Sequence, residues 1–153
     1  MATGTRSRVV VLNGPNLNLL GDREPEIYGT ERLEDHAARA REAAAFLGVD
    51  LEFAQAQSAG AMVEMVHAAR GRADALIVNP GALTHFAWSV HDALAAFAGP
   101  VVEVHLSNPA TREPWRHESV VAPVASGTIS GFGPQSYVFA VHAAVTLLRA
   151  RGA

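Results

Sequence analysis

Five side chains of this sequence could together transfer protons: Tyr28, His105, Arg23, Glu103 and Arg116. A tyrosine is an unusual base, because a free phenol titrates at about pH 10 and stays protonated at neutral pH. Arg23 lies five residues before Tyr28, and a neighbouring guanidinium favours the phenolate. A loop aromatic that only packs on the body of the protein would have no use for that arginine. We therefore predict acid–base chemistry.

The sequence lacks the local patterns of other common reaction classes. It contains no cysteine, which excludes disulfides, thiolate nucleophiles and cysteine-based metal sites. It has neither Gly-x-Gly-x-x-Gly after the first apolar run nor a Walker-type Gly-Lys-Ser/Thr, so nucleotide cofactors are disfavoured. His85 and His91 are six residues apart, away from a common helical face, and we expect no metal. Ser107 lies outside any Gly-x-Ser-x-Gly elbow.

The composition and charge of the chain favour a small-molecule partner over a nucleic acid or a membrane. The 153 residues are 49% hydrophobic and 18% charged, with a formal net charge of −3. No Lys/Arg block is present, which argues against a nucleic-acid partner because phosphates bind clustered cations. No stretch approaches the roughly 18 apolar residues of a membrane span. We expect a cytoplasmic protein without a nucleic-acid or membrane partner.

Apolar strand-like runs alternate with helical patterns along the chain. The strands are predicted at residues 9–12, 51–53, 75–78, 101–104 and 120–124, and the helices at residues 30–48, 61–70, 86–97 and 135–149. Thr30 is the predicted cap of the first helix and Gly48 its end. This alternation is typical of α/β proteins, and we predict a flavodoxin-like, doubly wound, five-stranded parallel sheet with helices on both faces. Residues 1–153 form a single catalytic domain in this interpretation.

Polar residues follow three of the predicted strands. Asn13 and Asn16 follow the first, Asn79 the third, and the stretch from His105 to Ser107 the fourth. One asparagine after a strand is more often a turn former than a ligand contact, but the carboxyl ends of parallel strands share one crevice, where ligands bind. The coincidence favours a binding site at this edge.

Two further features are expected to complete that site. Residues 13–30 form a connection much longer than usual, which predicts a lid loop over about residues 17–30. His85 and Asp92 are seven residues apart and would share one face of a helix that opens near Thr84. The alternative for this pair is a helix cap and a surface acid.

Three motifs resemble one enzyme family over nearly the whole chain. Residues 13–29 read Asn-Gly-Pro-Asn-Leu-Asn-Leu-Leu-Gly-Asp-Arg-Glu-Pro-Glu-Ile-Tyr-Gly, residues 79–85 read Asn-Pro-Gly-Ala-Leu-Thr-His, and residues 103–108 read Glu-Val-His-Leu-Ser-Asn. They are similar to the signatures of the type II 3-dehydroquinate dehydratases. The resemblance implies a cofactor-free, flavodoxin-like lyase that converts 3-dehydroquinate to 3-dehydroshikimate by anti elimination through an enolate. That step serves both aromatic biosynthesis by the shikimate pathway and quinate breakdown. Type I enzymes use a Schiff-base lysine, and this chain contains no lysine.

The resemblance also implies roles for the residues that match. Tyr28 would remove the proton beside the ketone, while Arg23 keeps Tyr28 ionised and stabilises developing charge. His105 would protonate the departing hydroxyl, with Glu103 orienting or polarising its imidazole. Asn16 would hold a water that stabilises the enolate.

The remaining matches concern binding and assembly. The implied substrate-binding residues are Asn79, His85, Asp92, Leu106, Ser107 and Arg116. The fork of Arg116 suits a carboxylate. In the family the residue matching Asp92 reaches the site of a neighbouring subunit, and trimers assemble into dodecamers, so we expect a homododecamer.

Two segments depart from the family pattern. Residues 57–60, Gln-Ser-Ala-Gly, are about two residues shorter than usual, and Pro114-Trp115 replaces a more usual Glu-Phe pair before Arg116. The alternatives to a lyase are a non-catalytic binder of a small hydroxy-carboxylate and an esterase-like hydrolase that uses Ser107 with His105.

Overall fold

Five parallel strands form one sheet in the computed structural model, which describes residues 4–152. The strands are β1 (Arg8–Asn13), β2 (Asp50–Gln55), β3 (Ala75–Asn79), β4 (Val101–His105) and β5 (Gly127–Ser130). Their order across the sheet is β2-β1-β3-β4-β5, and every neighbouring pair is parallel. This order is that of a flavodoxin-like sheet. The predicted fold class is confirmed.

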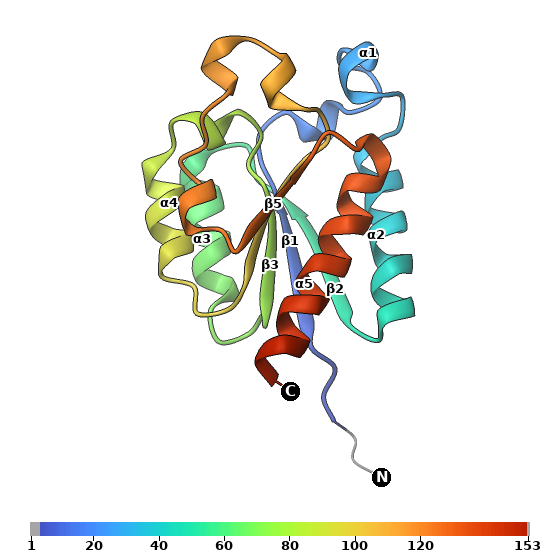
Figure 1. Ribbon diagram of the computed structural model, residues 1–153, viewed down its shortest axis with the longest axis vertical. Helices are drawn as coiled ribbons and strands as arrows, with labels where there is room; N and C mark the ends of the chain where they lie inside the picture. The colour runs from blue at the N-terminus through green and yellow to red at the C-terminus, as the bar shows by residue number, and fades with distance from the viewer. Residues whose placement is uncertain (1–3, 153) are drawn as a thin grey trace.

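Helices cover both faces of the sheet, as Figure 1 shows. α2 (Leu33–Leu47) and α5 (Ser136–Gly152) lie on one face, and α3 (Ala59–Ala69) and α4 (Trp88–Ala95) lie on the other. A single-turn helix, α1 (Pro25–Tyr28), lies beyond the sheet near its carboxyl edge. Within residues 4–152, no helix combines the length and the apolar character needed to cross a membrane.

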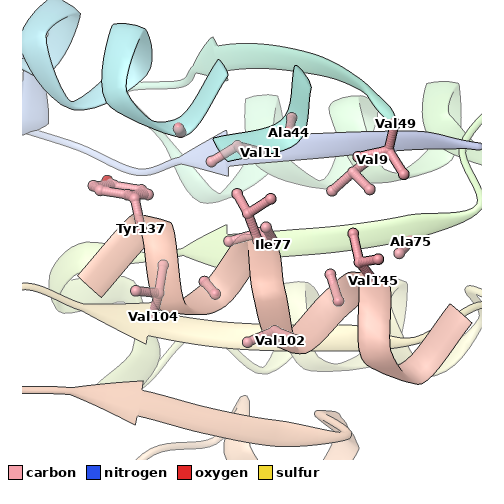
Figure 2. Close-up of a cluster of buried hydrophobic side chains, with 14 of the residues drawn as sticks. Val9, Val11, Ala44, Val49, Ala75, Ile77, Val102, Val104, Tyr137 and Val145 are labelled. Atoms are coloured by element: carbon pink, nitrogen blue, oxygen red, sulfur yellow. The ribbon is translucent and has the colours of Figure 1, made fainter. Parts of the chain in front are cut away.

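Each central strand contributes to two hydrophobic cores. Val9 and Val11 of β1 are buried against α2 and α5, in the core that Figure 2 shows around Ile77 and Val145. Val10 and Leu12, which point to the opposite face, are buried against α3 and α4. Because both faces are covered, the strands are apolar without alternation. This is why β1, β3 and β4 were recognisable from their sequence.

The predicted strand at residues 120–124 is wrong. Val121 is fully buried on the side of α3 and α4, and residues Ala122–Val124 form a 3-10 turn. Pro123 has no N–H to donate to a sheet ladder, which disfavours a strand there. The fifth strand is instead β5, an edge strand of Gly, Thr, Ile and Ser that carries no apolar run.

Two helix boundaries also differ from the prediction. α2 begins at Leu33 and not after Thr30, and the N–H of Arg32 donates to the Asp35 carboxylate at 2.9 Å. The predicted helix at residues 86–97 is shorter: a separate 3-10 turn covers Gly81–His85, and α4 begins only at Trp88. Phe86 between them has φ −153° and ψ −9°, outside the helical region, which interrupts the helix.

A buried hydroxyl joins α5 to the carboxyl ends of two strands. The Tyr137 hydroxyl donates to Asn13 Oδ1 at 2.5 Å and accepts from Asn79 Nδ2 at 3.0 Å. Asn13 Nδ2 continues the chain to the carbonyl of Ala54 in β2 at 2.9 Å. Burial raises the pKa of Tyr137, so the phenol stays neutral and can donate. The two asparagines at these strand ends therefore have a structural role.

Removing this hydroxyl should destabilise the protein. Tyr137→Phe leaves Asn13 Oδ1 and Asn79 Nδ2 without their buried partner, which costs about 1–3 kcal/mol in the free energy of unfolding. Urea denaturation of both proteins measures the difference. Thr146→Val is the control, because it removes an α5 hydroxyl that bonds only its own helix at an exposed position. Equal losses in the two variants would contradict the proposed link.

Candidate active site

The loops after β1, β3 and β4 enclose a cavity of about 60 Å³ at the carboxyl edge of the sheet. Most of the predicted site residues line it: Asn16, Arg23, Tyr28, Asn79, His85, His105, Leu106, Ser107 and Arg116. Of the other two, Glu103 is buried behind His105, and Asp92 lies on α4. The structure thus gathers three sequence motifs around one space.

Tyr28, the last residue of α1, is contacted by two arginines. Arg112 Nη1 donates to the Tyr28 hydroxyl at 2.7 Å, and its guanidinium carbon lies 5.1 Å from the ring centroid. The Arg23 guanidinium lies 5.2 Å from the same centroid and also pairs with Glu24 at 3.5 Å. Two guanidinium groups therefore lie against the phenol of Tyr28.

Arg112 is a site residue that the sequence analysis missed. Its side chain is only 11% exposed, and it bonds the phenol oxygen directly, whereas Arg23, the arginine expected beside Tyr28, lies over the ring. The available signal was weak: an arginine four residues before Arg116, in the segment that follows β4. Nothing in the local pattern indicated that it would contact a residue 84 positions away.

The base of the segment from Asn13 to Gly29 is tightly held. A Cβ at Gly14 would lie 2.3 Å from the Pro80 carbonyl oxygen, so only glycine allows the β1 and β3 loops to approach this closely. Gln57 accepts the Asn16 N–H at 3.1 Å and donates to Asn18 Oδ1 at 2.7 Å. The shortened segment at residues 57–60 therefore still supports the site.

His105, at the end of β4, contacts a buried carboxylate. Its Nε2 lies 2.6 Å from Glu103 Oε2. A carboxylate can only accept, so Nε2 carries a proton and Nδ1 remains for another partner. Burial on its own would raise the pKa of Glu103, but the hydrogen bond and charge of His105, with bonds from Thr84 and Ser119, together hold this pKa below its ordinary value.

His85 and Arg116 both contact Trp115. The His85 ring meets the indole edge-on with centroids 5.4 Å apart, and the Arg116 guanidinium lies 4.0 Å from the indole centroid. Glu118 O accepts from His85 Nδ1 at 2.6 Å, and Glu113 pairs with Arg116 Nε at 2.6 Å. Tryptophan binds cations over its ring better than phenylalanine does. Trp115, which stands where the family more usually has phenylalanine, thus holds Arg116 in place.

Two predicted residues are placed differently from expectation. Asn79 lines the cavity, but its amide is bonded to Tyr137 and to the Gly81 N–H. Asp92 is 83% exposed and contacts His91 at 3.0 Å. The expectation that His85 and Asp92 share a helical face is wrong, because His85 belongs to the 3-10 turn before α4.

The sheet order and the cavity at its carboxyl edge are those of a flavodoxin-like enzyme. The chain belongs to the class II dehydroquinase family, whose model matches residues 7–145. It is 54% identical over 141 residues to the 3-dehydroquinate dehydratase of Desulforudis audaxviator, covering 92% of this chain and 94% of that one. It is 49% identical to 3-dehydroquinate dehydratase 1 of Agrobacterium fabrum, covering 88% and 93%.

A solved structure agrees with the same family. The type II dehydroquinase from Propionibacterium acnes superimposes with a TM-score of 0.88 at 42% sequence identity, covering 93% of this chain and 98% of that chain. The resemblance stated from the sequence motifs is confirmed.

The charge on Glu103 should make stability depend on pH. Because its pKa is lowered on folding, Glu103 contributes stability above the ordinary value of 4.5, and that contribution is lost as pH falls through the folded value. Thermal unfolding should show that wild type loses its advantage over Glu103→Gln as pH falls below about 4.5. Glu64→Gln, at an exposed position on α3, is the control. A constant difference between wild type and Glu103→Gln at all pH values would contradict the assignment.

Proposed function

We propose that this protein dehydrates 3-dehydroquinate to 3-dehydroshikimate by anti elimination through an enolate. The relatives described above carry the name 3-dehydroquinate dehydratase. The observation that carries the proposal is the cavity that joins an arginine-bonded phenol, Tyr28, to a carboxylate-bonded imidazole, His105. These are the base and the acid that such an elimination needs.

The reaction consists of two proton transfers. The Tyr28 phenolate takes the proton beside the ketone, and the C–H electron pair passes to the ketone oxygen as an enolate. The enolate then re-forms the ketone as the C–O bond breaks, and His105 protonates the departing hydroxyl to give water. Tyr28 has gained one proton and His105 has lost one, so exchange with solvent restores both. Side chains supply every proton, and the proposal names no cofactor.

The surrounding charges support each step. Arg112 and Arg23 stabilise the phenolate and the negative charge that develops on the enolate. Asn16, on the cavity wall, is proposed to hold a water against the enolate oxygen. Arg116 binds the substrate carboxylate through its fork. His85, Asn79, Leu106 and Ser107 hold the rest of the ring.

The assembly is proposed to complete the site. Phe86 and Trp88, beside α4, are 63% and 62% exposed, which favours burial of this face in a subunit interface. Asp92 on the same helix would then reach the cavity of a neighbouring subunit. We propose trimers that assemble into a dodecamer, with residues about 17–30 as a lid over each site and residues 1–153 as one domain.

Neither alternative gains a specific observation. A serine hydrolase would need the second ring nitrogen of His105 to contact Ser107, and among the described residues the imidazole of His105 is bonded to Glu103 alone. A non-catalytic binder would have no use for the bond between Arg112 and the Tyr28 hydroxyl.

The direct test is turnover without added cofactor. Protein treated with a chelator and mixed with 3-dehydroquinate should show growth of the enone absorbance of 3-dehydroshikimate. Tyr28→Phe should reduce kcat by about 10²–10⁴-fold, because the base is lost while the ring remains. Calorimetric titration with substrate checks that the variant still binds. Folded wild type that binds 3-dehydroquinate but does not convert it would support the non-catalytic binder.

The two arginines should differ in their effect on the pH profile. Arg112→Ala removes the bond to the phenol oxygen, so the rising limb of kcat should move up by about 1–2 pH units. Arg23→Ala should shift it less, because Arg23 lies over the ring. Arg70→Ala, at an exposed position after α3, is the control. A larger shift for Arg23→Ala than for Arg112→Ala would reverse the assignment.

A further inference from the structure

The carboxylate of Glu103 receives hydrogen bonds from three side chains on three loops or strands. Besides His105 Nε2, the Thr84 hydroxyl lies 2.5 Å from Oε2. The Ser119 hydroxyl lies 2.9 Å from Oε1 and 3.0 Å from Oε2. Thr84 comes from the turn after β3 and Ser119 from the loop that precedes β5. Neither residue lines the substrate cavity described above.

The direction of these bonds follows from counting protons. The Ser119 oxygen accepts the N–H groups of Val121 at 3.1 Å and Ala122 at 2.9 Å, which occupy both of its lone pairs. It can therefore only donate further, either to Glu103 or to Thr84, whose oxygen lies 2.6 Å away. The Thr84 proton in turn has Glu103 as its acceptor, because Ser119 has no free lone pair.

His105 and Thr84 therefore donate to the Glu103 carboxylate, and Ser119 donates either to it or to the Thr84 hydroxyl. Glu103 and Thr84 are both buried, so water cannot replace a lost donor at low cost. A carboxylate surrounded by donors stays ionised, whereas a carboxylic acid would need an acceptor for its own proton. An ionised Glu103 in turn accepts the Nε2 proton of His105 and fixes the orientation of the imidazole.

We propose that Thr84 and Ser119 are positioning residues that keep Glu103 ionised and aimed at His105, so that His105 acts as the acid. The effect of this positioning on catalysis rests on the proposed dehydratase function, but the charge state of Glu103 does not. Thr84 belongs to the same turn as His85, and the Val120 N–H donates to the Thr84 carbonyl at 2.7 Å. The turn that places His85 at the cavity therefore also positions Glu103, the carboxylate that orients the proposed acid His105.

The other ionisable groups nearby lie around a second cavity. This cavity, of about 280 Å³, borders Glu103 and His105, and its wall also contains His85, Arg116, His117 and Glu118. Among the titratable groups of the described residues, His105 is the one bonded to the Glu103 carboxylate. Loss of a hydroxyl donor should therefore act first on the Glu103–His105 pair.

The test measures protonation of Glu103 directly. An infrared pH titration follows the C=O stretch of a buried, protonated carboxyl, assigned to Glu103 by its absence in Glu103→Gln. Thr84→Val keeps the shape of the side chain and removes the donor, so the midpoint should rise by about one pH unit. Ser119→Ala should shift it in the same direction. Thr84→Ser and Ser119→Thr, which retain the hydroxyl, should restore the wild-type midpoint.

Two controls separate this effect from general damage. Ser130→Ala changes a serine that lines the same cavity and should leave the midpoint unchanged. Ser119→Ala also removes an acceptor of two backbone N–H groups, so Thr84→Val is the cleaner variant and remains decisive if Ser119→Ala does not fold. Thermal unfolding confirms that each variant is folded.

Kinetics then connects the charge to the reaction. In Thr84→Val kcat for 3-dehydroquinate should fall while KM changes little, because Thr84 acts through Glu103 and His105 and not on the bound substrate. Midpoints equal to wild type in folded Thr84→Val would overturn the proposal, as would a shift in Ser130→Ala of the same size. If wild type does not turn over 3-dehydroquinate, the proposed function fails, and the infrared titration still decides the role of the two hydroxyls.

Discussion

The register of the strands at one edge of the sheet is the constraint on which the site depends. Asn13, the last residue of β1, pairs with both Gln55 of β2 and Asn79 of β3, so three strands end at the same height. Loops that leave at one height must pack against each other above it, and the contact of Gly14 with Pro80 shows how closely they do. The hydroxyl of Tyr137 then ties this edge to α5.

The site separates two kinds of charge. Guanidinium groups from Arg112 and Arg23 surround the phenol of Tyr28, while a buried carboxylate lies behind the imidazole of His105. The proposed elimination uses both arrangements, with the phenol as its base and the imidazole as its acid.

Much of the fold was predictable from local pattern, and the errors have physical causes. β1, β3 and β4 are buried on both faces, so their apolar runs stand out. The edge strand β5 needs no apolar residues, whereas Val120 and Val121 are apolar because they fill a core outside the sheet. A run of hydrophobic residues indicates that a segment is buried, and it does not indicate that the segment pairs with another strand. This is why the fifth strand was assigned to the wrong segment.

The sequence by itself determined the family, the order of most of the elements and most of the residues that reach the cavity, because these depend on motifs and on the period of hydrophobic residues. Tertiary structure decided which charges meet. Arg112 contacts a phenol 84 residues away, and Ser119 and Thr84 reach Glu103 from two different loops. Hydrogen bonds act over about 3 Å, and only the packed chain brings residues so distant in sequence within that range.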